Sequence, residues 1–148
     1  MNDVIAKIDT MTKQYLECFG RALIGIYYMP PLPSNNCFSA FMNSLVITLR
    51  RMELLPQYFW WRDGSGGRYL VLWMNGYFGN DLSAITPVIT RLWLRHNSTP
   101  ATGVGCFLLT AELQEYSNTR LQQMLSAISP YRVLPNSCHQ RTFGASRF

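Results

Sequence analysis

The chain has 148 residues, of which 48% are hydrophobic, 14% aromatic and 14% charged. A disordered chain would be rich in charge and poor in aromatic residues, so the composition excludes that class and predicts one domain over residues 1–148. A domain of this length buries enough apolar surface to fold without metal ions or disulfides. No apolar run reaches the roughly 18 residues that a membrane span needs, so we expect no membrane partner.

The net charge of +5 is concentrated toward the C-terminus. Residues 1–115 contain nine basic and eight acidic side chains, whereas residues 116–148 contain four arginines and no acidic side chain. Eleven of the thirteen basic residues are arginines, which bind phosphate and carboxylate groups in a bidentate manner. The pattern indicates a phosphate backbone or an acidic protein face as partner. The alternative is a solvated surface that keeps an apolar protein soluble.

The four cysteines, at positions 18, 37, 106 and 138, lack the C-x-x-C spacing that is typical of structural zinc sites. The chain begins Met-Asn-Asp-Val, without the basic and apolar segments of a signal peptide. We therefore expect no metal and no cofactor, and a cytoplasmic protein with free thiols.

The first half of the chain predicts two amphipathic helices around a buried strand. Apolar residues recur every three or four positions from Asn2 to Phe19, and Gly20 is the expected end of this helix. The run Ala22–Met29 is apolar and β-prone, and prolines stop it. Ser34 or Asn35 is the expected cap of the second helix. Its expected buried stripe is Phe38, Phe41, Met42, Leu45, Leu49 and Met52.

A hairpin is predicted next, from strands Tyr58–Arg62 and Arg68–Asn75 joined by the glycine-rich loop 63–67. Asn80 or Asp81 is the expected cap of a third helix, and Pro87 leaves two alternatives, a kinked helix or a late start.

The rest of the chain predicts a strand, a helix and a tail. Gly105–Thr110 is the expected fourth strand, and a short helix is expected from Ser117 or Asn118 up to Pro130. Residues 131–148 are expected to form an irregular basic tail.

This order of elements predicts an α+β fold. Its middle is the split βαβ pattern (βαββαβ) of ferredoxin-like and RRM-like folds, a four-stranded antiparallel sheet with two helices on one face and extra N- and C-terminal helices. An open sheet face could stack single-stranded bases on aromatic side chains, but the RRM signature is absent, and we expect these side chains to lie in the core and on the sheet surface. The aromatic residues in question are Tyr58, Phe59, Trp60, Trp61, Tyr69 and Trp73.

No catalytic constellation is evident in the sequence. The eight carboxylates are scattered, no Gly-x-Ser-x-Gly occurs, and loop 63–67 lacks the Lys-Ser/Thr of a P-loop. We therefore predict no catalytic residue.

Four sequence segments resemble segments of one known family. They are Ala22–Pro30 (ALIGIYYMP), Tyr58–Asp63 (YFWWRD), Arg68–Gly76 (RYLVLWMNG) and the closing Arg141–Arg147 (RTFGASR). In these phrases and in the order of elements, the chain resembles the replication-initiator-like proteins of filamentous phages and prophages, the inovirus gene-two-product group. The resemblance runs over almost the whole length and implies a phage or mobile-element origin and a bacterial host.

That family is similar to the HUH endonucleases, which nick single-stranded DNA. Their chemistry needs two histidines flanking one residue on a strand, so that both hold a metal ion, and a tyrosine on a later helix that attacks the phosphate. The corresponding triplet here is Arg68-Tyr69-Leu70, and Ala127 takes the place of the nucleophile. Pro130 takes the place of a basic partner. The resemblance thus implies a degenerate, non-enzymatic member.

We therefore expect a non-catalytic binding protein that occludes a nucleic-acid site or a host nucleoprotein complex, for example a CRISPR complex. Arginine and histidine side chains would contact phosphates or acidic groups of that partner. The expected binding residues are Arg62, Arg68, Arg120, Arg132, His139, Arg141 and Arg147.

Two alternatives remain at the level of sequence. One is a nicking, replication-initiating enzyme with a rebuilt site, in which Tyr131 is the nucleophile and His96 or His139 supplies a base or a metal ligand. The other is a structural or assembly protein whose basic tail becomes ordered on a partner. The low charged fraction favours an apolar contact patch, and a homodimer would bury much of it.

Overall fold

The structure is a computed structural model that describes residues 2–32, 34–62, 64, 66–75, 83–110 and 143–146. These ranges form an α+β fold with three helices and an open antiparallel sheet of five strands. The elements are α1 (Asn2–Phe19), β1 (Arg21–Met29), α2 (Asn35–Arg51), β2 (Gln57–Arg62), β3 (Arg68–Met74), α3 (Thr86–Trp93), β4 (Thr102–Thr110) and β5 (Phe143–Ala145).

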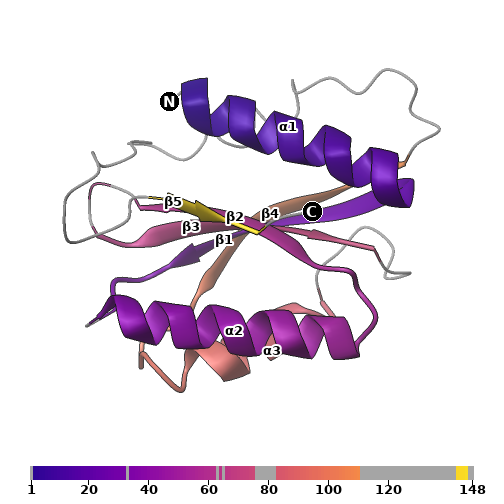
Figure 1. Cartoon of the computed structure of the whole chain (residues 1–148). Coiled ribbons are helices and arrows are strands. Elements are labelled where there is room, and N and C mark those ends of the chain that lie inside the picture. The colour runs from indigo at the N-terminus through magenta and orange to yellow at the C-terminus, as the bar shows by residue number, and fades with distance from the viewer. Residues whose placement is uncertain are drawn as a thin grey trace.

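Helices cover both faces of the sheet, whose strand order is β4-β1-β3-β2-β5 (Figure 1). Helix α1 lies on one face, and α2 and α3 lie on the other. Because side chains alternate along a strand, each central strand contributes to two cores. On β3, Val71 and Trp73 pack with α1, whereas Leu70, Leu72 and Met74 pack with α2 and α3.

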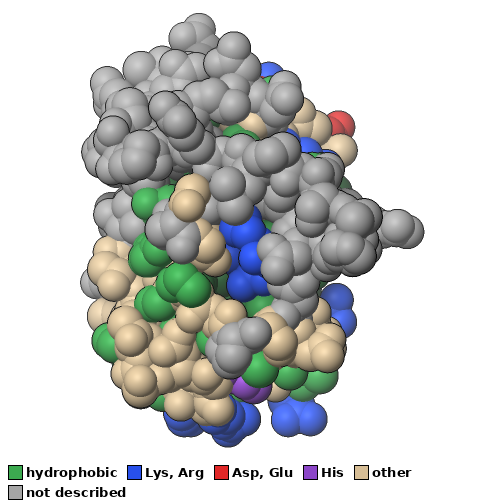
Figure 2. Space-filling model, turned by 90° about the vertical axis from the view of Figure 1, so that its left-hand side faces the viewer, with side chains coloured by type: hydrophobic (Ala, Val, Ile, Leu, Met, Phe, Trp, Pro, Cys, Tyr) green, Lys and Arg blue, Asp and Glu red, His purple; other side chains and the backbone are tan. Residues whose placement is uncertain are grey.

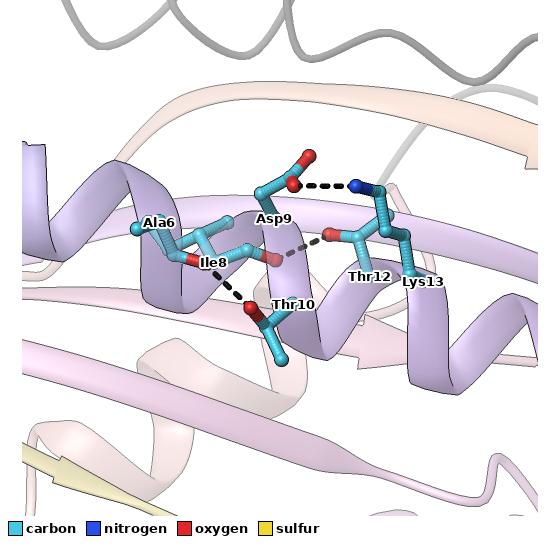
Figure 3. A network of polar contacts seen from close by, with 6 residues as sticks. All are labelled: Ala6, Ile8, Asp9, Thr10, Thr12 and Lys13. Carbon is cyan, nitrogen blue, oxygen red and sulfur yellow. Dashed lines mark hydrogen bonds and ion pairs between the residues drawn. The ribbon is translucent and has the colours of Figure 1, made fainter.

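Helix α1 forms as its periodicity predicts. Every third or fourth residue is buried, and the chain leaves the helix at Gly20, whose φ of 76° lies in the left-handed region that glycine adopts without strain. Figure 3 shows polar contacts along this helix: Thr10 and Thr12 donate to the carbonyl oxygens of Ala6 and Ile8. The exposed Lys13 pairs with Asp9 at 3.0 Å, a surface pair that adds little stability.

The starts of α2 and α3 follow from local chemistry. The Ser34 hydroxyl caps α2 by accepting a hydrogen bond from the Cys37 amide at 3.3 Å. Helix α3 starts late, at Thr86, so that Pro87 lies in its first turn, where a missing N–H costs nothing. The late start is therefore the correct alternative, and residues 80 and 81 lie outside the described ranges.

Two predictions about the fold are wrong. Met52 belongs to the expected buried stripe but is 39% exposed, because α2 ends at Arg51 and the chain turns away there. The sheet has a fifth strand, because residues 143–145 of the expected irregular tail pair with β2. The predicted helix after Ser117 lies outside the described ranges.

Four of the six aromatic strand residues lie in the core, and Tyr58 and Tyr69 are partly buried against it. Phe59, Trp60, Trp61 and Trp73 are buried, because α1 covers one face of the sheet and α2 with α3 covers the other. This burial rules out base stacking on these four rings. Within the described ranges, no helix has both the length and the apolar character needed to cross a bilayer.

Strand β5 joins the sheet through close backbone packing. Gly144 lies opposite Trp60, and a Cβ atom on Gly144 would lie 2.5 Å from the indole Nε1. Ser146 continues the pairing: its amide donates to the carbonyl oxygen of Tyr58 at 2.9 Å, and its hydroxyl accepts from the Tyr58 amide at 2.8 Å. A glycine is needed at position 144 for steric reasons.

We predict that Gly144→Ala destabilises the protein by about 1–3 kcal/mol, because the new methyl group overlaps the Trp60 indole. The measurement is the midpoint of urea unfolding. Gly64→Ala is the matched control, since a Cβ atom there meets nothing within 4 Å, and its midpoint should match that of the unmodified protein. Equal midpoints for both variants would contradict this account of β5.

Buried polar side chains hold α1 in place. The Tyr15 hydroxyl donates to the carbonyl oxygens of Leu55 at 2.8 Å and Leu54 at 3.3 Å, in the loop that follows α2. Glu53 and Leu55 in this loop have φ values of 61° and 49°, which are strained for residues other than glycine. The Trp73 indole N–H donates to the Thr12 hydroxyl at 2.9 Å. The Tyr15 hydroxyl therefore connects α1 to the strained loop between α2 and β2.

We predict that Tyr15→Phe lowers the free energy of unfolding by about 1 kcal/mol at pH 7, through the lost hydrogen bonds. Burial raises the pKa of Tyr15 above its usual value. The folded protein therefore keeps this proton while an unfolded tyrosine ionises, and the stabilisation falls as pH rises above about 10. The stability difference between the unmodified protein and Tyr15→Phe should shrink in urea unfolding above that pH. A difference that is constant from pH 7 to pH 11 would contradict this.

Candidate functional site

Two predicted binding residues, Arg62 and Arg68, face each other across the β2–β3 hairpin. They are direct partners in the last described pair of the ladder before the loop. Directly opposed residues of an antiparallel pair have Cβ atoms about 4.5–5.5 Å apart, so their side chains lie together on one face. By alternation from Trp60 and Leu70, this is the face covered by α2 and α3. We call these two residues the arginine pair.

Both members of the arginine pair are buried. Arg62 is 8% exposed and Arg68 is 3% exposed, which is unusual for a charged side chain. Burial, and secondly the nearby charge of Arg62, lowers the pKa of Arg68 to about 10. Arg68 therefore still carries its charge at pH 7. Two like charges share a partly desolvated site.

Aromatic rings surround the guanidinium of Arg68. Its central carbon lies 4.1 Å from the centroid of the Phe38 ring and 5.1 Å from that of the Trp60 ring. The two rings meet edge to face, with centroids 5.1 Å apart. Contacts of a cation with ring faces stabilise the charge and restrict the orientation of the guanidinium plane. Phe38 and Trp60 thus hold Arg68 in one place.

Several elements meet at the end of the sheet where loop 63–67 joins β2 to β3, and we call this the hairpin end. A Cβ atom on Gly66 would lie 3.9 Å from Pro31, and one on Gly67 would overlap the Tyr28 hydroxyl, so the loop packs closely on the end of β1. The side-chain Nδ2 of Asn97 donates to the Pro31 carbonyl oxygen at 2.9 Å and brings the segment after α3 to the same place.

The hairpin end brings the arginine pair and the N-terminus of α2 to the same end of the sheet. Helix α2 begins there, and its first turn contains no acidic residue to offset the positive end of its dipole. Figure 2 faces this side of the molecule and shows Lys and Arg atoms in the middle of the face, with hydrophobic side chains beside them. Of the acidic residues with described side chains, Asp9 and Glu17 are on α1 across the sheet, and Glu53 follows the other end of α2.

The other predicted binding residues cannot be placed. Arg120, Arg132, His139, Arg141 and Arg147 lie outside the described ranges. In sequence, Arg141 precedes Phe143 by two residues and Arg147 follows Ser146 directly, so both flank β5.

For the alternative nicking site, Tyr131 also lies outside the described ranges, and His96 is half-buried in the turn after α3, where its amide donates to the carbonyl oxygen of Trp93 at 2.9 Å. Cys18 and Cys37 are free thiols. In the part of the chain that the structure describes, no group of three or more His, Cys, Asp or Glu side chains is close enough to hold a metal ion.

Sequence reasoning missed the aromatic half of the site. Phe38 was assigned to a buried helical stripe and Trp60 to the core, and both assignments are confirmed. Neither assignment indicates contact with Arg68, because Phe38 lies thirty residues away in the chain on a different element. The pairing of Arg62 with Arg68, in contrast, follows from the bounds of loop 63–67, because the two residues that flank a hairpin loop lie opposite each other.

In comparisons with known proteins, the sequence matches no family model, no curated protein and no solved structure. The resemblance to the phage initiator family stays a prediction.

We predict a coupling free energy of about 0.5–2 kcal/mol between Phe38 and Arg68, because the ring stabilises a desolvated guanidinium. The measurement is a double-mutant cycle of Phe38→Leu and Arg68→Met by urea unfolding at pH 7. Phe59→Leu with Arg68→Met is the matched control, since Phe59 packs in the core on the opposite face of the sheet, under α1. Purely additive effects in the Phe38 cycle would contradict a role for this contact.

Proposed function

We propose that this protein is a non-catalytic binding protein of phage or mobile-element origin. It occludes a nucleic-acid site or a host nucleoprotein complex, such as a CRISPR complex. The main support for this proposal is Arg68. The family resemblance implies an imidazole that binds a metal ion at this position, whereas this chain has a buried guanidinium there. A guanidinium has no lone pair to give to a metal ion, and its charge would repel one.

The neighbouring position supports the same proposal. Leu70, which corresponds to the second imidazole of the resemblance, is fully buried between β3 and the helices of the same face. Its isobutyl group contributes to packing and offers no ligand atom. Positions 68 and 70 therefore have core roles in this chain in place of metal binding.

We further propose that the fold is of the ferredoxin-like, split βαβ type, extended by α1 and β5. The order β4-β1-β3-β2 supports this, since β3 lies between β1 and β2 and runs antiparallel to both. Helices α2 and α3 follow β1 and β3 in the chain and share one face, as that topology requires.

The test of the non-catalytic proposal is incubation of the purified protein with end-labelled single-stranded DNA and Mn²⁺. We expect neither a cleavage product nor a protein–DNA adduct on a denaturing gel, because the residues for both steps are replaced. An adduct would contradict the proposal and favour the nicking alternative. Loss of such an adduct in Tyr131→Phe would then identify the nucleophile.

The binding part of the proposal is tested by affinity capture from a bacterial host lysate with and without nuclease. A nucleoprotein target survives nuclease treatment, whereas capture of nucleic acid alone is lost. For single strands, the logarithm of the binding constant should fall by about 0.7 per phosphate contact for each unit of log salt concentration. Recovery of no specific partner under either condition would contradict an occluding function.

A further inference from the structure

The charged side chains of the described helices are sorted onto opposite faces of the sheet. Residues 34–52 and 83–100, which include α2 and α3, contain four arginines and no acidic residue, a formal charge of +4. Helix α1, on the other face, contains two lysines and three acidic residues, a formal charge of −1. Figure 2, in which the α2–α3 side lies at the bottom as in Figure 1, shows Lys and Arg atoms along that edge. The near-neutral sum over residues 1–115 therefore conceals a basic face.

We propose that the outer surface of α2 and α3 binds single-stranded nucleic acid through its phosphates. We call this surface the α2–α3 face, and six exposed side chains define it. They are Ile47, Arg50, Arg51, Arg91, Leu94 and Arg95. The proposal deepens the function proposed above by naming a ligand and the surface that takes it, and it rests on that function for its biological role.

The four arginines of this face are accessible to a ligand. All four are exposed, and within the described ranges none of them forms an ion pair. Glu53, directly after α2, is the described acidic residue nearest to them in sequence, and it does not pair with Arg50 or Arg51. A phosphate would therefore meet guanidinium groups whose donors are not already bound to a carboxylate.

Helix dipoles do not account for this distribution of charge. They favour acidic residues in the first turn of a helix and basic residues in the last. Arg50, Arg51 and Arg91 fit the second half of that rule, but the first turns of α2 and α3 contain no acidic residue. On α1 the last turn contains Glu17 and no basic residue. The sign of the charge thus follows the face of the sheet more closely than the helix end.

Apolar side chains beside the arginines favour a single strand over a duplex. Ile47 is 48% exposed and Leu94 is 47% exposed. Ile47 precedes Arg50 and Arg51 by three and four residues, and Leu94 follows Arg91 by three, so each lies next to an arginine on its helix. An unpaired base offers a face that stacks on a guanidinium plane and contacts an aliphatic group. A duplex hides these faces in its own stack.

The positions of the arginines require an extended ligand. Helices α2 and α3 pack side by side, with the ring centroids of Phe41 and Trp93 5.1 Å apart. Arg91 lies close to this contact, two residues before Trp93. Arg51 lies ten residues after Phe41, roughly 15 Å along the helix axis. At the roughly 3.4 Å per phosphate of a stacked strand, that length corresponds to about four or five nucleotides.

The experiment measures binding of a fluorescein-labelled, twenty-nucleotide oligothymidylate to the full chain by fluorescence anisotropy at pH 7. The double variant Arg51→Gln with Arg91→Gln should bind about a hundredfold more weakly in about 50 mM salt, and its log–log salt slope should be shallower by about 1.4, since each lost phosphate contact removes about 0.7. Lys7→Gln with Lys13→Gln is the matched control, because it removes two exposed charges from α1 on the opposite face. It should keep the affinity and the slope of the unmodified protein.

Further variants separate charge, base contact and folding. Arg51→Lys with Arg91→Lys should keep the salt slope, because both charges remain, and Glu53→Gln should bind severalfold more tightly. Ile47→Ser with Leu94→Ser should weaken binding without changing the slope, since neither side chain is charged. A duplex of the same length should bind more weakly than the single strand. Melting temperatures confirm that each variant is folded.

The proposal is overturned if the oligonucleotide does not bind in low salt, if the arginine and lysine double variants bind equally well, or if the duplex binds more tightly than the single strand. It is also overturned if the arginine double variant loses a lysate protein whose capture survives nuclease treatment, because the face then binds an acidic protein surface. Each of these results leaves the occluding function intact as long as the unmodified protein still captures a specific partner, so the two failures are distinguishable.

Discussion

The alternation of side chains along β3 decides which of its residues face α1 and which face α2 and α3. β3 is the middle strand of the sheet, and helices cover both of its faces, so both sets of side chains are buried. A shift of one residue would exchange the two sets and place Arg68 under α1 among apolar side chains. Trp73 opposes such a shift, because its indole N–H bonds the buried Thr12 on α1. The register that forms the core therefore also sets the arginine pair.

Burial of two guanidinium groups is tolerated here because of what surrounds them. Arginine is weakly hydrated for a cation and stacks on aromatic faces, whereas a lysine in the same place would lose a tightly held water shell. Phe38 approaches from α2 and Trp60 from β2, so a helix and a strand together provide the contacts of Arg68. The site therefore depends on tertiary packing.

The closing phrase Arg141–Arg147 has a structural explanation in its described part. Gly144 allows the backbone to approach Trp60, and Ser146 pairs with Tyr58 through its amide and its hydroxyl. These roles account for a glycine and a serine without any appeal to binding. The flanking arginines, which these contacts do not explain, are the part of the phrase that the proposed function uses.

Local pattern was sufficient for most of the architecture. The spacing of apolar residues predicted α1 and α2 nearly to the residue, and the glycine-rich loop predicted the β2–β3 hairpin. What the sequence could not determine was which distant segments meet. Periodicity reports the face that a residue occupies and carries no information about the partner across that face. Hence the contact of Phe38 with Arg68 and the pairing of β5 with β2 were decided by tertiary packing, where shape and the burial of apolar area select among many segments of similar composition.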